Sequence, residues 1–228
     1  MQIIDKIRSE RKMQRAKENR RYILEAAEKI FTQKGYSGTT MDEIAEEAHF
    51  SKVTIYRYFQ SKNDIFFDIM FNSLEAVKEK MSEILNEKIT SEQKLQKIIK
   101  YILDYYHKKR NLIRIFYLER PMIKKMLSLY PQTTKGADNH VHQHPKIPER
   151  FMRMLKDINN IINLVIKEGM DRNEFRKIHV QEAGFILGAM LRGVYFRGPK
   201  LGKEYSLDKS ADLLLDFFLH GIKKERSH

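Results

Sequence analysis

The segment SKVTIYRYFQSK, residues 51–62, concentrates side chains with the chemistry to hold a polyanion. It combines charged nitrogen donors with hydroxyl groups and phenol rings, the groups that contact DNA phosphates and the base edges of the major groove. Its β-branched and aromatic content favours a strand, but tertiary packing overrides such propensities in a helical neighbourhood. We therefore expect a short helix whose outer faces carry Lys52, Thr54, Arg57 and Tyr58.

Two earlier helices are expected to position this segment. One spans about residues 20–34 and ends at Gly35, and the other spans about residues 41–48. A helix-turn-helix needs a small residue where its second and third helices cross, and Ala45 meets that need. The inward side chains then form a small core of Ile44, Ala48, Ile55 and Phe59.

The rest of the chain also has a helical pattern. Only 10 Gly and 5 Pro occur in 228 residues, and long apolar repeats of period 3.6 dominate, so the sequence predicts an all-α fold. Ser61 with Asp64, and Thr90 with Gln93, are capping boxes that open two of the later helices. Residues 130–148 have the composition of a loop, and further helices are expected at about 149–167, 180–196 and 207–224.

Composition limits the classes of partner. The formal charge of +13 favours nucleic acid, an anionic membrane surface or an acidic ligand. The absence of Cys excludes disulfides, thiolate metal sites and a cysteine nucleophile. The charged start MQIIDKIRSERK lacks the apolar region of a secretory signal, and no apolar run approaches the roughly 20 residues that span a bilayer. These features predict a soluble, cytoplasmic protein without a membrane partner.

Basic residues are densest in residues 6–21, where eight Lys or Arg stand against two Glu. Such a segment is either a solvated tail or a basic arm that follows the DNA backbone.

Catalytic and metal-binding motifs are absent from the sequence. His140, His142 and His144 alternate beside Asp138, and imidazoles at this spacing on a strand would bind zinc, nickel or copper. Their context is that of a loop, however, so we predict neither a metal site nor a cofactor. There is no metal-binding helix motif, phosphate-cradling glycine loop or nucleophile elbow, which argues against an enzyme.

The order of residues in TTMDEIAEEAHFSKVTIYRYFQSKNDIF, residues 39–66, resembles the DNA-binding motif of TetR-type (TetR/AcrR-like) transcriptional regulators. The preceding ILEAAEKIFTQKGYSGTT resembles the first helix and Gly-Tyr turn of that family. The sequence departs from the family pattern at the inter-helix turn, where His49 and Phe50 replace Gly and an aliphatic residue. It departs again at Val53, where the family has Gly. The second departure implies an altered base preference.

The resemblance implies roles for individual residues. Lys52, Val53 and Thr54 are expected to contact base edges. Phosphate contacts are expected from Tyr56 and Tyr58, and from Thr40 and Lys62 at the starts of the flanking helices. The predicted DNA-binding residues are Thr40, Ser51, Lys52, Val53, Thr54, Tyr56, Arg57, Tyr58 and Lys62.

The resemblance also implies a domain organisation and a mode of action. It divides the chain into a basic N-terminal extension (1–19), a helix-turn-helix DNA-binding domain (20–64) and a helical effector-binding and dimerisation domain (65–228). A small apolar effector would release a repressor from its operator, and candidate pocket residues are Tyr105, Phe116 and Met154. The alternative is a DNA-binding protein of the same fold that acts architecturally or through a protein partner, without any effector.

The final two helices predict a homodimer. SADLLLDFFLHGI is apolar on almost every side, so it needs cover on more than one face, either from its own core or from a second subunit. Glycines at four-residue spacing on the preceding helix permit close helix approach. With the resemblance, this favours two subunits that read a pseudo-palindromic operator on double-stranded DNA. The predicted interface residues are Gly184, Gly188, Leu191, Leu214, Phe217 and Phe218.

Overall fold

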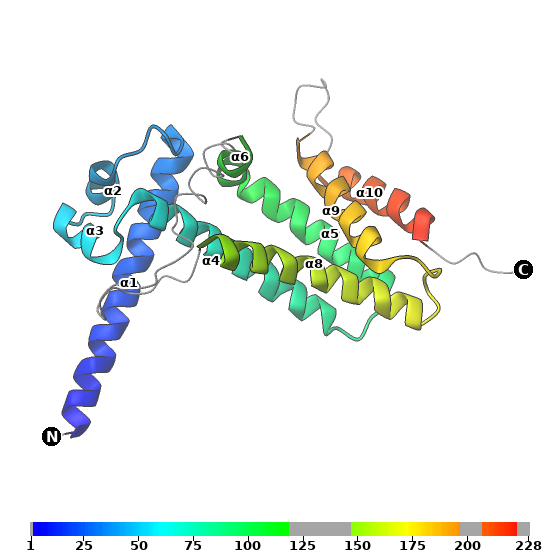
Figure 1. The fold of residues 1–228 in the computed structure, drawn as a ribbon, viewed down its shortest axis with the longest axis horizontal. Coiled ribbons are helices and arrows are strands. Elements are labelled where there is room, and N and C mark those ends of the chain that lie inside the picture. Colours follow the sequence, from blue (N-terminus) through cyan, green and yellow to red (C-terminus); the bar gives the residue numbers. More distant parts are fainter. Residues whose placement is uncertain (1, 119–146, 197–206, 223–228) are drawn as a thin grey trace, which may run out of the picture. The chain divides into compact units, whose positions relative to one another are not determined.

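A computed structural model describes residues 2–118, 147–196 and 207–222, and the regular elements in these ranges are helices (Figure 1), which confirms the all-α prediction. Two compact units are present, one made of residues 1–72 and 111–135, the other of residues 73–110 and 136–228. The helices are α1 (Gln2–Lys34), α2 (Met41–Glu47), α3 (Lys52–Tyr58), α4 (Lys62–Leu85), α5 (Ser91–Lys108), α6 (Arg110–Leu118), α8 (Ile147–Asp171), α9 (Val180–Phe196) and α10 (Leu207–Ile222).

Local signals set most helix ends in the N-terminal unit. Gly35 follows α1 with a φ of 74°, a left-handed conformation that glycine adopts without strain, and its N–H caps the Phe31 carbonyl at 2.9 Å. Thr40 and Ser51 cap the starts of α2 and α3. The Ser61 hydroxyl accepts from the Asp64 N–H at 3.3 Å as α4 begins. The predicted starts and stops are thus confirmed, except that α1 continues back to Gln2 instead of beginning near residue 20.

Aromatic packing forms the core of the N-terminal unit. The Phe31 ring stacks on Tyr36 with centroids 5.5 Å apart, and Phe66 meets both rings edge-on at 5.8 and 5.2 Å. These contacts join α1, the turn after it and the first turns of α4. Side chains of α2 and α3 add Ile44, Ala45, Ile55 and Phe59, all at most 5% exposed. The predicted helix-turn-helix core is therefore present, with Ala48 half-buried at its edge.

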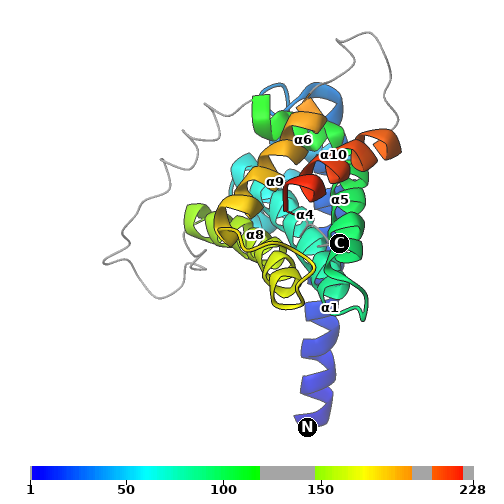
Figure 2. The same cartoon turned by 90° about the vertical axis from the view of Figure 1, so that its right-hand side faces the viewer.

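In the C-terminal unit, α5 packs against α8, α9 and α10, and α9 packs against both α8 and α10. Figure 2 shows these four helices gathered around a shared interior. The apolar stripe of α5 lies at the centre, where Leu95, Ile98 and Ile99 are completely buried. α4 enters this unit at Ser73 and supplies Val77, Met81 and Ile84 to the same core. The sequence-based domain boundary at residue 64 stays a prediction.

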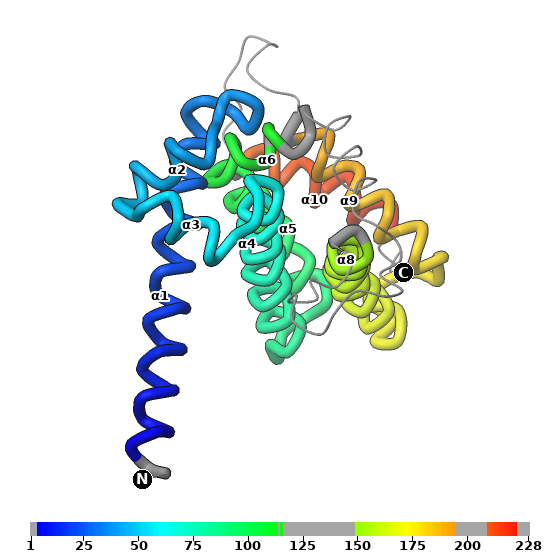
Figure 3. The backbone as a smooth tube through the Cα atoms, turned by 60° about the vertical axis from the view of Figure 1, so that its left-hand side comes forward, coloured from blue at the N-terminus to red at the C-terminus, as the bar shows by residue number. Residues whose placement is uncertain are grey.

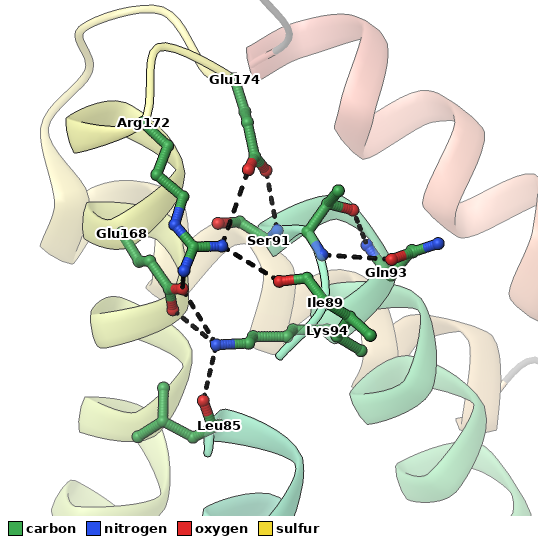
Figure 4. A network of polar contacts seen from close by, with 9 residues as sticks. Leu85, Ile89, Ser91, Gln93, Lys94, Glu168, Arg172 and Glu174 are labelled. Atoms are coloured by element: carbon green, nitrogen blue, oxygen red, sulfur yellow. Dashed lines mark hydrogen bonds and ion pairs between the residues drawn. The ribbon is translucent and has the colours of Figure 1, made fainter. Parts of the chain in front are cut away.

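A buried lysine fastens one end of the C-terminal unit (Figure 4). Lys94 is 3% exposed, and its ammonium donates to the Leu85 carbonyl at 2.6 Å and to the Glu168 carboxylate at 2.8 Å. Arg172 braces Glu168 at 2.7 Å, and Glu174 accepts from the Ser91 N–H at 2.7 Å. This network ties the last turn of α4 and the first turn of α5 to the end of α8.

No helix in the described ranges is long and apolar enough to cross a bilayer. Within the same ranges, no group of three or more His, Cys, Asp or Glu side chains is arranged to hold a metal ion. The alternating histidines His140, His142 and His144 lie outside the described residues.

Candidate nucleic-acid interface

The turn between α2 and α3 is made by a left-handed histidine. His49 has a φ of 55°, and the Phe50 N–H reaches back across it to the Ala45 carbonyl at 3.0 Å. This pattern ends a helix with a residue in the conformation that glycine usually supplies. Histidine therefore fills the position in which the resemblance expects Gly, at some conformational cost. The geometry of the turn is kept although the residue differs.

α3 shows opposite characters on its two sides. Ile55 and Phe59 are 0% and 2% exposed and anchor the helix to the core, as predicted from their spacing. On the outer side, Val53 is 79% exposed and Tyr56 is 46% exposed, and Lys52 and Arg57 are exposed as well. The outer face thus combines cations, a phenol and one branched apolar group. This is the mixture that phosphates and a thymine methyl would accept.

Ser51 fixes the first turn of α3. Its hydroxyl accepts from the Thr54 N–H at 3.2 Å and lies 2.8 Å from the Thr54 hydroxyl. The two hydroxyls hold each other, so Thr54 enters any DNA contact from a preset rotamer and half-buried. Ser51 therefore acts first as a helix cap, and a nucleic-acid contact by its hydroxyl would have to share that bond.

Lys52 is held by an acid of the preceding helix. Its ammonium lies 2.7 Å from Asp42 Oδ1, and both side chains are more than half exposed. The hydrogen bond and charge of Asp42 raise the pKa of Lys52 above its ordinary value, so this cation stays charged. An exposed ion pair is weak. A DNA phosphate is therefore able to replace Asp42 as the partner of Lys52.

Thr40 is an N-cap whose own N–H is occupied, and its predicted phosphate contact stays a prediction. Glu43 Oε2 accepts from the Thr40 N–H at 2.8 Å, and the Thr40 hydroxyl accepts from the Glu43 N–H at 3.2 Å. A hydrogen bond from Lys34, with those from Thr40, lowers the pKa of Glu43 from 4.5 to about 2. Thr40 and Glu43 thus form a closed capping box that sets the start of α2.

The C-terminal end of α3 is fastened to α1. Asn19 Nδ2 donates to the Tyr58 hydroxyl at 3.0 Å, and Arg20 donates to the Tyr58 carbonyl at 3.3 Å. The Arg20 guanidinium also stacks 4.3 Å from the centroid of Phe59 and pairs with Asp68. Tyr58 is half-buried by these contacts, so it positions α3 in addition to any phosphate contact.

Lys62 donates hydrogen bonds within its own chain that the sequence did not indicate. Its ammonium donates to the Tyr36 carbonyl at 2.8 Å and the Thr39 carbonyl at 2.6 Å, and it lies 4.4 Å from the centroid of the Tyr36 ring. These contacts tie the start of α4 to the turn that leads into α2. The predicted phosphate clamp at Lys62 stays a prediction, and in this structure the side chain orders the unit.

The predicted effector residues fall on three helices. Tyr105 on α5 is half-buried and donates to the Ser73 carbonyl at 3.2 Å, and Met154 on α8 is 5% exposed. Phe116 lies on α6, and its side chain is outside the described part of the structure.

Most predicted interface residues on α9 and α10 face the core of their own chain. Leu191, Leu214 and Phe218 are at most 5% exposed. A Cβ on Gly184 would lie 2.1 Å from Asn163 Oδ1, so this glycine permits close approach to α8 and not to a second subunit. A Cβ on Gly188 would have only Arg192 Nη1 near it, at 3.4 Å, which is an ordinary contact.

Other residues of these two helices carry the exposed apolar surface. Phe217, which the sequence did predict, is 66% exposed on α10, and Leu213 one turn earlier is 48% exposed. On α9, Phe185 and Ile186 are 63% and 51% exposed, and the sequence-based set omitted them. The sequence shows that Leu213 and Phe217, at i and i+4, share one face of the helix. It does not show which face is buried, because the helix is apolar on almost every side.

Comparison with known proteins agrees with this geometry. Residues 23–69 match the model of the family described as "Bacterial regulatory proteins, tetR family". The HTH-type transcriptional regulator YhgD of Bacillus subtilis is 34% identical over 99 residues, which are 43% of this chain and 52% of YhgD, so the match spans about half of that relative. The fatty acid metabolism regulator protein of B. subtilis is 24% identical over 88% of this chain and 93% of its own length.

The fold extends the similarity beyond the matched segment. The crystal structure of the B. subtilis regulator FadR in complex with stearoyl-CoA superposes with a TM-score of 0.68 at 21% identity, covering 88% of this chain and 97% of FadR. These relatives are transcriptional regulators and not enzymes. The matched helix-turn-helix, the similar relatives and the shared fold together support a TetR-type helix-turn-helix regulator.

Proposed function

We propose that this protein is a cytoplasmic, sequence-specific transcriptional repressor. It binds a pseudo-palindromic operator as a homodimer and leaves the operator when a small apolar effector binds. One observation carries the DNA-binding part: the outer face of α3 exposes Lys52, Val53 and Tyr56, while Ile55 and Phe59 lock its inner face to the core. A short helix with this division fits the recognition helix of a helix-turn-helix, which lies in the major groove.

Contacts on α3 divide into two kinds. Val53 and Thr54 lie at the first turn, where recognition helices reach base edges, and they carry no charge, so they are suited to reading sequence. Tyr56 and Arg57 follow on the exposed side and supply phosphate donors. Lys52 serves either purpose once a DNA group replaces Asp42.

The dimer is supported by the exposed apolar side chains of α9 and α10. These two helices pack against each other within one chain (Figures 1 and 2), and their outward side chains Phe185, Ile186, Leu213 and Phe217 are about half or more exposed. Large apolar side chains exposed on two neighbouring helices are suited to an interaction site. Two copies related by a two-fold axis would bury it in an isologous four-helix bundle.

The effector class follows from the relatives. A regulator of similar fold binds stearoyl-CoA, and a relative that matches over 88% of this chain is named for fatty acid metabolism. We therefore expect a long-chain acyl thioester, whose acyl chain would supply the apolar part, to be the first effector to test. Its binding must favour a conformation in which the two α3 helices no longer match the half-site spacing. α4 continues from the N-terminal unit into the C-terminal unit and is a direct path for that coupling.

Selection of bound sites from a random duplex pool tests this function. The expected product is an inverted repeat with half-sites about one helical turn apart or a multiple of it. Val53→Gly should change the preferred base at one symmetric position, by about 1–3 kcal/mol between bases. Arg57→Gln is the control, because loss of a phosphate contact should weaken all sequences equally. A pool that shows no enrichment would overturn the proposal.

Stearoyl-CoA added to the protein–operator complex tests the effector. Release of the operator at micromolar ligand, with free CoA as the control, is the expected result. An operator complex that is unaffected by acyl-CoAs of any chain length would favour the effector-independent alternative.

A further inference from the structure

We propose that the N-terminal half of α1, residues 2–19, is a second DNA-contacting surface that binds phosphates without reading sequence. The inference rests on the DNA-binding function proposed above and extends the contact surface beyond α3. Figure 3 shows this half of the helix projecting past α2 and α3, whereas the second half packs between them and α4. At 1.5 Å per residue, the projecting half is about 27 Å long.

Burial gives this segment no role in the core. Each residue from Ile4 to Arg15 is exposed, and the first completely buried residue of α1 is Ile23. An isolated helix of this length is marginal in water, but here it extends a helix whose second half is packed, so no new nucleus is needed. The cations of this segment are thus presented on a helix that the folded unit has already begun.

Four of these cations form a stripe. Arg8, Arg11, Lys12 and Arg15 follow the spacing i, i+3, i+4 and i+7, which places them on one side of the helix over about 10 Å. A DNA strand presents one phosphate per about 3.4 Å of axis. A stripe of this length therefore matches about three consecutive phosphates of one strand.

The stripe is unpaired, unlike the cations further along the same helix. Among the described residues, none of its four members has a hydrogen-bond or ion-pair partner. In contrast, Arg21 pairs with Glu25 at 2.7 Å and Lys29 pairs with Glu47 at 2.6 Å. Glu10 lies within the same span, but helical periodicity places it on about the opposite side of the helix from the stripe. Asp5 and Glu18 lie beyond the two ends of the stripe, and Glu18 accepts from Gln14 at 3.0 Å. The cations are therefore available to an external anion.

The position of the stripe favours DNA over a membrane. Asn19, the last residue of this segment, and Arg20, directly after it, hold the C-terminal end of α3 through Tyr58, so the part of α1 that carries the stripe begins beside the proposed recognition helix. Membrane-surface helices need a continuous apolar face. The exposed apolar residues here are divided, because Met13 lies on about the opposite side of the helix from Ile4 and Ile7.

The test compares two quadruple variants of the full-length protein on the selected operator across a salt series. The first is Arg8→Gln, Arg11→Gln, Lys12→Gln and Arg15→Gln. The control, Lys80→Gln, Lys97→Gln, Lys100→Gln and Lys108→Gln, removes the same charge from exposed cations of the C-terminal unit that are already paired with acids. Gln has nearly the helix propensity of Arg and Lys, so circular dichroism should show both variants folded.

We expect the stripe variant to bind at least about tenfold more weakly at 0.15 M salt, with an equal loss on operator and on random DNA. If two contacts per chain are lost from a dimer, the slope of log K against log salt falls by about 4. The control should keep the slope of the original protein. Equal affinity and slope in the two variants would overturn the inference.

Two further outcomes separate the possible failures. If the unmodified protein selects no DNA sites, the proposed function itself fails. If the stripe variant keeps DNA binding but loses binding to phosphatidylglycerol-containing vesicles, the surface serves a membrane and the inference is wrong.

Discussion

α3 and α10 both expose large side chains, but the two helices are built for different partners. On α3 the exposed Val53 and Tyr56 alternate with Lys52 and Arg57, and one narrow apolar side faces inward. On α10 the exposed Leu213 and Phe217 stand over a second, buried apolar side. A charged groove accepts the first pattern, whereas only another apolar surface accepts the second.

The two helices also differ in what holds them in place. α3 depends on its Ser51 cap, on the exposed pair between Lys52 and Asp42 and on the bond from Arg20 to the Tyr58 carbonyl. The neighbouring α2 depends on the Glu43 capping box, and Lys62 orders the turn before it. α10 lies in a unit of which one end is fastened by a buried ion pair between Lys94 and Glu168. We expect changes to the first set to affect DNA binding and the acid limit of stability. Changes to the second set should affect global stability.

The largest expected effect comes from Phe217→Asp on α10. A carboxylate in an apolar interface loses hydration without gaining a partner, so dimer dissociation should increase by about 100-fold or more. Operator affinity should fall with it, because two linked recognition helices are lost. Sedimentation velocity measures the first effect and operator titration the second. Asn160→Asp, which adds the same charge to an exposed site on α8, should change neither. A dimer that survives Phe217→Asp would assign the apolar surface to another partner.

Lys94→Met should cause the next largest change, a loss of about 3 kcal/mol in the free energy of unfolding. The substitution leaves the Glu168 carboxylate and the Leu85 carbonyl without their buried donor. Urea denaturation gives the value. Lys97→Met on the same helix removes an exposed pair with Glu87 and should cost about 0–1 kcal/mol. Similar losses of unfolding free energy in both variants would show that the buried network contributes no more to stability than an exposed ion pair.

Lys62 and Lys52 allow a structural cation to be compared with a proposed DNA-binding cation within the N-terminal unit. Lys62→Met should lower the free energy of unfolding by about 1.5–3 kcal/mol, because two carbonyls lose a charged donor. Lys52→Met should leave stability almost unchanged but lower operator affinity and the salt slope. Urea denaturation and operator titration across a salt series should be carried out on both variants. A lower salt slope for Lys62→Met would support the phosphate contact predicted for Lys62 from the sequence.

The smallest expected effect is the pH dependence that Glu43 introduces. Its pKa is lowered to about 2 in the folded protein, so ionised Glu43 stabilises the fold above its ordinary pKa of 4.5. That contribution should disappear as the pH falls from about 4.5 to about 2. Glu43→Gln lacks it, and the difference in melting temperature between the two proteins should therefore narrow over this range. A constant difference would show that Glu43 acts only through its neutral hydrogen bonds.

Much of the helix-turn-helix was predictable because its signals are local. Thr40, Ser51 and Ser61 cap helices through contacts within three residues, and the inward spacing of Ile55 and Phe59 follows from helix geometry. The strand propensity of residues 53–59 misleads only when the segment is considered alone, because burial of Ile55 and Phe59 on one face stabilises the helix. The structural roles of Thr40 and Lys62 were harder to predict. The sequence does not show whether the Thr40 N–H or the Lys62 ammonium is already hydrogen-bonded within the folded chain.

The sequence alone determined that this chain is all-helical, that residues 51–62 carry side chains suited to a DNA contact and that its last helices are apolar on more than one side. Local capping, helical periodicity and residue chemistry are sufficient for those conclusions. Only the tertiary structure decided which side of α9 and α10 is exposed, which lysines are already bound and that residues 2–19 continue α1 as a helix with an unpaired basic stripe. Each of these depends on contacts between residues distant in the chain, and periodicity within one helix does not encode them.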